Sequence, residues 1–378
     1  MFAFLALLSL ARAECPTQAA PLPDWPDGSA RADAASAEIA ALEQWLFPPE
    51  LDRADKERRG VRTDGVVLIH RGEVVYERYG PGWSADRPHL AWSVSKSFMG
   101  ALAGMAVHRG LLRVEDSVCA HLSELPEASC AITVEHLLGF SSGLDWRETY
   151  EGESPTSSSV LAMLYGEGRG DMARFVLSHP LRYPAGSAYQ YSSGDSNALS
   201  AVVGAVLEPV GGERYPWTML LDPLGFRGAV WERDGAGTYV GSSYLYARPR
   251  DLGRFGQLLL QDGCWAGERL LPEGWVAWAS EVNSAQRSRP LDFVVGDPVQ
   301  GRQLWLNRAL PEQGAPTRPW PSAPEDTVAA LGHWRQAIYI IPSLNLVAVR
   351  TGDDRDESYT HDAFLARAVD VARRLELP

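Results

Sequence analysis

The stretch Trp92-Ser-Val-Ser-Lys-Ser-Phe98 holds one of only two lysines in a chain of 378 residues. The other is Lys56, and arginine supplies all the rest of the 35 Lys and Arg residues. Arginine keeps its proton in a protein, whereas a lysine that is desolvated or placed beside another charge can become neutral and act as a base. Lys96, the third residue after Ser93, is therefore a candidate catalytic base.

The residues that follow Ser93 predict a buried helix. Apolar residues recur at helical spacing from Val94 to Arg109, and Gly110 comes directly after them. Positions three apart share one helix face, with Cβ atoms about 5 to 6 Å apart, so the amino group of Lys96 can reach the Ser93 hydroxyl. The helix N-terminus adds free N–H groups and the positive end of its dipole. One turn thus supplies a nucleophile, a base and part of an anion hole. The plainer alternative is an N-capping serine followed by a solvated lysine.

Composition limits the classes of partner. Hydrophobic residues make up 45% of the chain and charged residues 22%, which is enough apolar material for a large core. The net charge of −13 and the absence of a basic stripe argue against nucleic-acid binding. There is no Cys-x-x-Cys and no His-Glu-x-x-His, so we expect neither a metal site nor a cofactor.

The N-terminus resembles a secretory signal. Residues 1–13 form a short apolar run that ends in Ala-Arg-Ala, although a basic start is missing, and residues 14–30 read as a loose leader. We therefore expect a secreted or periplasmic protein whose mature chain has no membrane span. Cys119 and Cys130 are close enough in sequence to close a local loop, which leaves Cys15 and Cys264; four free thiols are the alternative.

Two strand pairs lie near opposite ends of the chain. Residues 64–70 and 73–79 predict one hairpin, and residues 337–341 and 345–350 predict another. Residues 360–376 have the pattern of an amphipathic closing helix. The fold class expected is α/β (α+β), with one antiparallel sheet flanked by helices and an inserted, mostly helical lobe.

The domain boundaries follow from where the helical patterns lie. Residues 116–225 carry helical and loop patterns and form the inserted lobe of this prediction. Residues 31–115 and 226–378 then form the α/β lobe.

Four segments resemble the penicillin-recognising serine hydrolases, in that family's order and across nearly the whole chain after the leader. They are closest to the class C β-lactamase-like branch that includes esterases and 6-aminohexanoate-dimer hydrolases. The segments are Ser93-Val-Ser-Lys96, Ile132-Thr-Val-Glu-His-Leu-Leu-Gly-Phe-Ser-Ser-Gly-Leu-Asp-Trp146, Tyr183-Pro-Ala-Gly-Ser-Ala-Tyr-Gln-Tyr-Ser-Ser-Gly-Asp195 and Arg250-Asp-Leu-Gly-Arg-Phe-Gly-Gln-Leu-Leu-Leu260. The resemblance implies a β-lactamase/transpeptidase-like fold and acyl transfer through a serine ester.

The resemblance also implies roles for particular residues. Ser93 matches the nucleophile and Lys96 its activating base. Tyr191-Ser-Ser193 takes the place of the Tyr-x-Asn motif, so Tyr191 would relay a proton, with a pKa lowered by the nearby ammonium, and Ser193 would contact substrate. The alternative for Tyr191 is a core tyrosine in a turn.

The third family motif, Lys-Thr-Gly, is missing. The chain has no lysine after Lys96, and residues 329–336 occupy the matching place before a strand. The backbone N–H groups of Ser93 and His333 would then form the oxyanion hole. Loss of the cation should weaken the binding of substrates with a carboxylate, unless Arg335 replaces it. The His333 side chain is either a substrate contact or an ordinary strand-end histidine.

Trp146 and Tyr150 follow the second family segment, which borders the pocket in relatives. They would form an aromatic wall for an apolar acyl or amide group. With 13 tryptophans in the chain, packing is the competing role.

Three hypotheses follow. The first is a serine hydrolase that forms an acyl-enzyme at Ser93 and acts on a small-molecule carboxylic ester or amide. The second is a β-lactamase or a D-Ala-D-Ala carboxypeptidase-type penicillin-binding enzyme. The third is a catalytically silent binding protein on the same scaffold, which the intact Ser93, Lys96 and Tyr191 disfavour.

Overall fold

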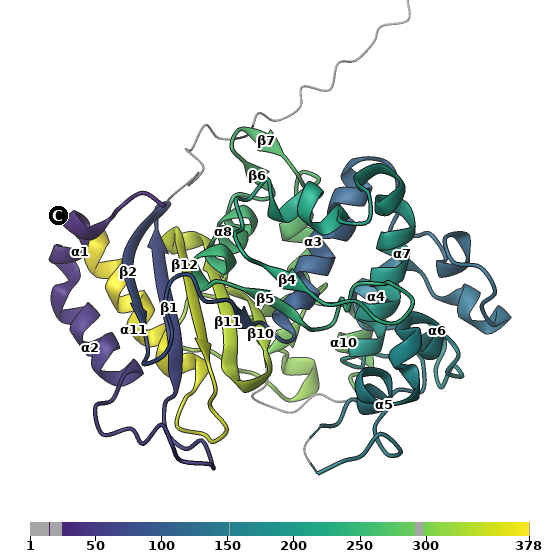
Figure 1. Ribbon diagram of the computed structural model, residues 1–378, viewed down its shortest axis with the longest axis horizontal. Helices are drawn as coiled ribbons and strands as arrows, with labels where there is room; N and C mark the ends of the chain where they lie inside the picture. Colours follow the sequence, from purple (N-terminus) through teal and green to yellow (C-terminus); the bar gives the residue numbers. More distant parts are fainter. Residues whose placement is uncertain (1–14, 16–24, 151, 292–297, 378) are drawn as a thin grey trace, which may run out of the picture.

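A computed structural model describes residues 15, 25–150, 152–291 and 298–377 (Figure 1). Its main feature is a seven-stranded antiparallel sheet in the order β2-β1-β12-β11-β10-β9-β8. The strands are β1 Thr63–His70, β2 Glu73–Tyr79, β8 Val299–Gln300, β9 Trp305–Leu306, β10 Val328–Gly332, β11 Gln336–Ile341 and β12 Leu346–Gly352.

The two predicted hairpins lie side by side in one half of this sheet. β1 pairs with β12, with Val67 opposite Val349, so a strand from each end of the chain lies side by side. The expected antiparallel sheet flanked by helices is confirmed, and strand ends differ from the expected ranges by one or two residues. The second hairpin turns through Pro342–Leu344, where proline cannot donate to the ladder.

Helices cover both faces of the sheet (Figure 1). Side chains alternate between faces along each strand, so Val67 and Ile69 join one core cluster while Val66 and Leu68 join the other. The first face packs against α3 Val94–His108 and α8 Pro249–Leu260. The second packs against α2 Ser36–Leu46 and α11 His361–Glu376. The predicted closing helix over residues 360–376 is thus present as α11.

The remaining helices and strands lie outside the main sheet and the four helices that cover it. Residues 116–225 contain the helices α4 to α7, and the boundaries of a separate lobe there stay a prediction. The further elements are α1 Ser29–Ala32, α4 Val134–Leu138, α5 Ser159–Tyr165, α6 Met172–Leu177, α7 Ser193–Gly211, α9 Trp275–Ala279, α10 Ser284–Ser288, β3 His89–Leu90, β4 Val230–Trp231, β5 Leu245–Ala247, β6 Cys264–Trp265 and β7 Glu268–Arg269.

α3 lies in the middle of the molecule and joins the helical region to the sheet. Every residue from Val94 to Ala106 is buried, and the helix packs against both α7 and β10. The ring of Phe98 stacks on Phe255 of α8 with 3.7 Å between centroids. At Gly104 a Cβ would lie 2.7 Å from the Trp275 ring, so glycine permits this close approach. The predicted helix is therefore held in place by its neighbours, and its first turn is held with it.

The four cysteines form two disulfides, Cys119–Cys130 and Cys15–Cys264. The local pairing is confirmed, and the two leftover cysteines also pair. The expected signal peptide, residues 1–13, lies outside the described residues, as does most of 14–30. Of the helices described, none has both the length and the apolar character to cross a bilayer.

The stacked rings of α3 and α8 give a stability prediction. Phe98→Ala should lower the free energy of unfolding by about 3 to 5 kcal/mol, because it removes a fully buried ring and leaves a cavity. Guanidinium unfolding measures this change, with Val210→Ala on the exposed surface expected to stay within about 0.5 kcal/mol of wild type. Equal effects of the two substitutions would contradict the central place of α3.

Candidate active site

The first turn of α3 brings Ser93 and Lys96 together. Lys96 Nζ donates hydrogen bonds to Ser93 Oγ at 2.9 Å, Ser193 Oγ at 3.0 Å and the carbonyl oxygen of Ser242 at 3.0 Å. The side chain is buried, with Lys96 only 2% exposed. The plainer alternative of a solvated lysine is therefore wrong. Three acceptors hold the amino group in one place beside the serine.

Burial changes the proton affinity of this amine. It lowers the pKa of Lys96 from 10.5 to about 8, and the opposing charge of Glu148 keeps it from falling further. At neutral to mildly alkaline pH a useful fraction of Lys96 is neutral. The geometry therefore suits removal of a proton from Ser93.

Tyr191 lies on the other side of the same amine. Its ring centroid is 5.0 Å from Lys96 Nζ, and its hydroxyl is hydrogen-bonded with Ser93. Phe140 and Trp305 pack against the ring, which fixes its position. The expected lowering of the pKa is wrong: burial and the charge of Glu148 raise the pKa of Tyr191 well above its usual value. The group is a phenol and not a phenolate, so in this arrangement it is suited to give a proton.

Glu148 is a site residue that the sequence pattern missed. Its carboxylate accepts hydrogen bonds from Trp146 Nε1 at 2.6 Å, Tyr150 hydroxyl at 2.6 Å, Ser193 N–H at 2.9 Å and Ser193 Oγ at 2.5 Å. The only signal in the sequence is its place between Trp146 and Tyr150, and an isolated glutamate in a loop carries little information. Its negative charge acts on the pKa of Lys96.

The end of β10 passes directly beside Ser93. A Cβ on Gly332 would lie 2.3 Å from the carbonyl oxygen of Ala91 and 3.2 Å from the Ser93 nitrogen, so only glycine fits. His333 follows at once and begins the short turn His333–Arg335, in which Trp334 and Arg335 have positive φ. The backbone of this turn therefore lies near Ser93, where the predicted oxyanion hole would be.

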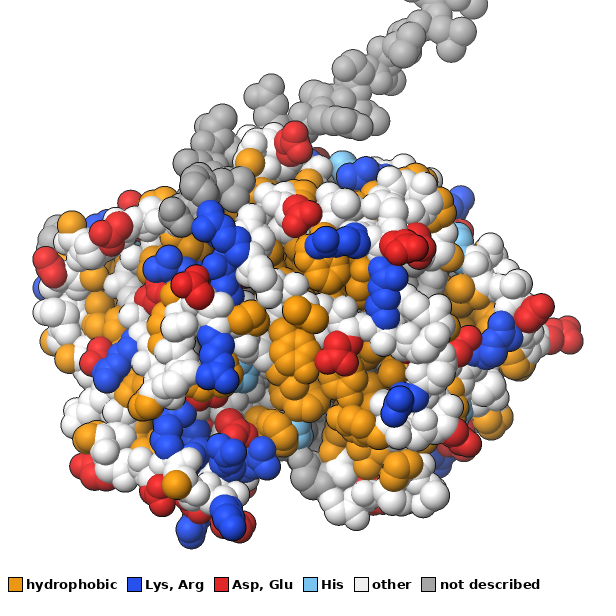
Figure 2. Space-filling view, in the orientation of Figure 1, with side chains coloured by type: hydrophobic (Ala, Val, Ile, Leu, Met, Phe, Trp, Pro, Cys, Tyr) orange, Lys and Arg blue, Asp and Glu red, His pale blue; other side chains and the backbone are white. Residues whose placement is uncertain are grey.

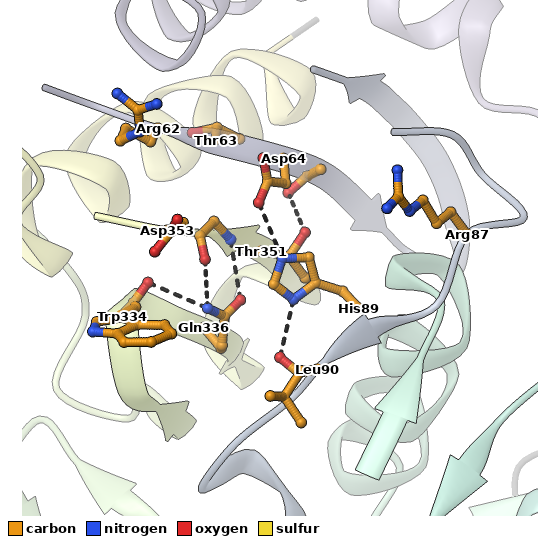
Figure 3. A network of polar contacts seen from close by, with 12 residues as sticks. Arg62, Thr63, Asp64, Arg87, His89, Leu90, Trp334, Gln336, Thr351 and Asp353 are labelled. Carbon is orange, nitrogen blue, oxygen red and sulfur yellow. Dashed lines mark hydrogen bonds and ion pairs between the residues drawn. The ribbon is translucent and has the colours of Figure 1, made fainter. Parts of the chain in front are cut away.

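Gln336 anchors that turn. Its side-chain amide donates to the carbonyl oxygens of His333 and Trp334 at 3.2 and 3.3 Å and to that of Gly352 at 2.6 Å, and it also accepts from the Gly352 N–H at 3.0 Å. Figure 3 shows Gln336 reaching the Trp334 carbonyl, beside the Asp64–His89 contact that ties β1 to β3. The turn is thus tied to the neighbouring strand β12.

A cavity of about 230 Å³ opens over Ser93. Most of its wall is aromatic or aliphatic, and Figure 2 shows hydrophobic side chains gathered on the surface between β10 and α5. Trp92 and Trp334 both have φ near +50°, a strained conformation for large residues that is typical of functional sites. The lining residues are Trp92, Ser93, Tyr150, Leu161, Leu164, Tyr165, Ser193, Ser242, Ser243, His333 and Trp334.

The expected substrate-contact residues separate into two groups. Tyr150, Ser193 and the His333 side chain line the cavity, and the His333 ring stacks on Tyr150 with 5.5 Å between centroids.

Two other expected residues do not line it. Trp146 is 4% exposed, packs against Gly194 and holds Glu148 through its indole nitrogen, so it supports the site from behind. Arg335 is also absent from the described lining residues, and its charge acts on the pKa of His361 at the far face of the sheet. The geometry therefore gives no support to the substrate roles expected for Trp146 and Arg335.

Comparison with known proteins shows similarity to β-lactamase-like hydrolases. The family model described as Beta-lactamase matches residues 49–370. The 6-aminohexanoate-dimer hydrolase of Paenarthrobacter ureafaciens is 25% identical over 332 residues, covering 83% of this chain and 79% of that protein.

Solved structures share the fold at lower identity. A penicillin-binding protein homologue from Caulobacter crescentus has a TM-score of 0.64 and 16% identity, covering 91% of this chain and 98% of that one. EstCE1, described as a hydrolase with promiscuous acyltransferase activity, has a TM-score of 0.59 and 15% identity, covering 91% of this chain and 100% of that one.

The lowered pKa of Lys96 predicts how the reactivity of Ser93 depends on pH. If neutral Lys96 is the base, the rate at which a fluorophosphonate probe labels Ser93 should rise with pH, with a midpoint at about 8 and a plateau at higher pH. Lys96→Arg should lower this rate at least about 100-fold at every pH, because a guanidinium keeps its proton. Mass spectrometry of the labelled peptide at a series of pH values measures both rates. A flat profile, or full reactivity of the arginine variant, would exclude Lys96 as the base.

Proposed function

Because the chain belongs to the beta-lactamase family, we propose that it is a serine hydrolase that forms an acyl-enzyme at Ser93 and hydrolyses a small carboxylic ester or amide. The observation that carries this proposal is the 2.9 Å hydrogen bond between Lys96 Nζ and Ser93 Oγ, made by a buried amine whose pKa is lowered to about 8. A neutral amine in hydrogen-bond contact with a serine is the arrangement that nucleophilic catalysis requires.

The reaction would proceed in two half-reactions. Ser93 Oγ attacks the carbonyl carbon while its proton passes to Lys96, and the backbone N–H groups of Ser93 and His333 stabilise the oxyanion. Tyr191 gives its proton to the leaving alcohol or amine and recovers one from Lys96. Water then attacks the ester of Ser93, its proton returns through the same groups, and the carboxylic acid leaves.

The cavity supports an uncharged, apolar acyl group. Leu161, Leu164 and the tryptophans Trp92 and Trp334 form much of its wall, and neither Lys nor Arg is among its described lining residues. A substrate carboxylate would lack the cation that such groups usually require. This favours a neutral ester or amide over a β-lactam or a D-Ala-terminated peptide.

A penicillin-type activity is the second candidate. The similarity in fold to a penicillin-binding protein homologue and to a class C β-lactamase favours it. The missing Lys-Thr-Gly motif weighs against it, because His333-Trp-Arg335 follows β10 instead.

We also propose that the protein works outside the cytoplasm. All four cysteines of the chain are paired in the structure, and disulfides persist mainly in oxidising compartments. The apolar run over residues 1–13 agrees with export.

Two chromogenic substrates test the proposed reaction. Wild-type protein should hydrolyse p-nitrophenyl butyrate, with a burst of p-nitrophenol where deacylation is slow, and should hydrolyse nitrocefin much more slowly. Ser93→Ala should reduce ester hydrolysis by at least about 1,000-fold, whereas Ser123→Ala at an exposed position should have no effect.

The other outcomes are equally informative. Dominant nitrocefin hydrolysis that needs Ser93 would favour the penicillin-type enzyme. Ester hydrolysis that survives in Ser93→Ala would exclude Ser93 as the nucleophile. Inactivity toward both substrates, with no probe labelling of Ser93, would favour a binding protein.

A further inference from the structure

The contacts of Glu148 leave it no free capacity to accept a proton. An ionised carboxylate has about four lone-pair positions, and Glu148 receives four hydrogen bonds. Oε2 accepts from Trp146 Nε1 and the Ser193 N–H, and Oε1 accepts from the hydroxyls of Tyr150 and Ser193. A general base needs an open lone pair facing water or substrate. Glu148 therefore has a different role from that of a base.

Glu148 determines where the Ser193 hydroxyl points its proton. That hydroxyl has one proton, and its shortest contact, at 2.5 Å, is to Glu148, which can only accept. Tyr150 also gives its own proton to Glu148, at 2.6 Å, so its 3.3 Å contact with Ser193 does not supply another acceptor of comparable strength. Towards Lys96, Ser193 is consequently an acceptor.

This direction fixes the neutral form of Lys96. A neutral amine has two protons and one lone pair. Its three partners are the Ser193 hydroxyl, the Ser242 carbonyl oxygen and the Ser93 hydroxyl, all at 2.9 to 3.0 Å. The carbonyl is always an acceptor, and Glu148 makes Ser193 one as well. Both protons are thereby used, and the remaining lone pair faces Ser93.

We propose that Glu148 is a positioning residue that acts through Ser193 to direct the lone pair of Lys96 at the Ser93 hydroxyl. The proposal rests on the proposed function, because it concerns the same nucleophile and base. It also gives the second serine of the Tyr191-Ser-Ser193 segment a role in orienting the base.

The charge of Glu148 acts on several titratable groups around the amine. It raises the pKa of Lys96 and of the phenols Tyr191 and Tyr150. It also adds to the burial that raises the pKa of Asp195, bound to Ser142 on the far side of the Tyr191 segment, to about 7. The ring of His333 stacks on Tyr150 at the mouth of the cavity. Glu148 reaches Lys96 through a single hydroxyl, that of Ser193, and makes the shortest contact with it.

Glu148→Gln removes the charge and reverses one hydrogen bond while it leaves the size of the side chain almost unchanged. The two fixed N–H donors require the amide oxygen of glutamine on their side, so its NH₂ group would face Ser193. Ser193 would then accept from the amide and turn its proton towards Lys96. We expect the plateau rate of fluorophosphonate labelling to fall at least about tenfold. We also expect the midpoint of the pH profile to move at least about half a unit lower, because a negative charge is lost.

Matched variants complete the experiment. Glu148→Asp keeps the charge but shortens the side chain, so its plateau should fall while its midpoint stays near that of wild type. Glu153→Gln, at an exposed position in the same loop, should change neither value. Ser193→Ala removes the bridging hydroxyl and should lower the plateau as Glu148→Gln does, with no further loss in the double variant. Thermal melting of each variant identifies any that does not fold.

The results distinguish the inference from the proposed function. A lower plateau and a lower midpoint in Glu148→Gln would support the inference. A plateau that falls without movement of the midpoint in Glu148→Gln would overturn it, and so would a plateau that does not fall. If Glu148→Gln does not fold, an unchanged plateau in Ser193→Ala would overturn the inference equally. Wild-type protein that is never labelled at Ser93 would instead overturn the proposed function.

Discussion

The burial of one amino group is the constraint on which the candidate site depends. An ammonium ion removed from water loses much of its solvation, and Lys96 recovers part of it through three oxygen partners and the charge of Glu148. Because burial outweighs these interactions, Lys96 holds its proton less tightly than an exposed lysine does. A more exposed lysine would keep its proton at neutral pH, and one buried without partners would be too costly to retain.

The fold supplies this environment from distant parts of the chain. α7 and the sheet, with Phe255 of α8, bury α3 along most of its length, which holds its first turn in place. The first turn of α7 brings Ser193, and the loop before β5 brings the carbonyl oxygen of Ser242. β10 ends against Ser93 because Gly332 allows the two backbones to approach closely. The same rigidity that stabilises the core thus preorganises the site.

Local patterns in the sequence were enough to predict the hairpins, α3 and α11, because their periodicity is expressed within single segments. The spacing of Ser93 and Lys96 was also enough to predict their contact, because one helical turn determines how the two side chains lie. Glu148 and the opposing tryptophans Trp92 and Trp334 were not predictable, because their importance arises from contacts between segments far apart in the chain. The direction of the pKa change at Tyr191 was wrong for a related reason: a neighbouring cation is visible in a motif, whereas the degree of burial is not.

The scarcity of lysine has a practical consequence for handling the protein. Lys96 is 2% exposed, whereas Lys56 lies on the surface between α2 and β1 and is absent from the described lining of the cavity. Reagents that acylate amines should therefore attach a dye, a spin label or a solid support at Lys56 and at the α-amino group, and leave the interior amine unmodified. The folded chain thus offers a single exposed lysine for attachment without any engineered cysteine, which would risk exchange with the two disulfides.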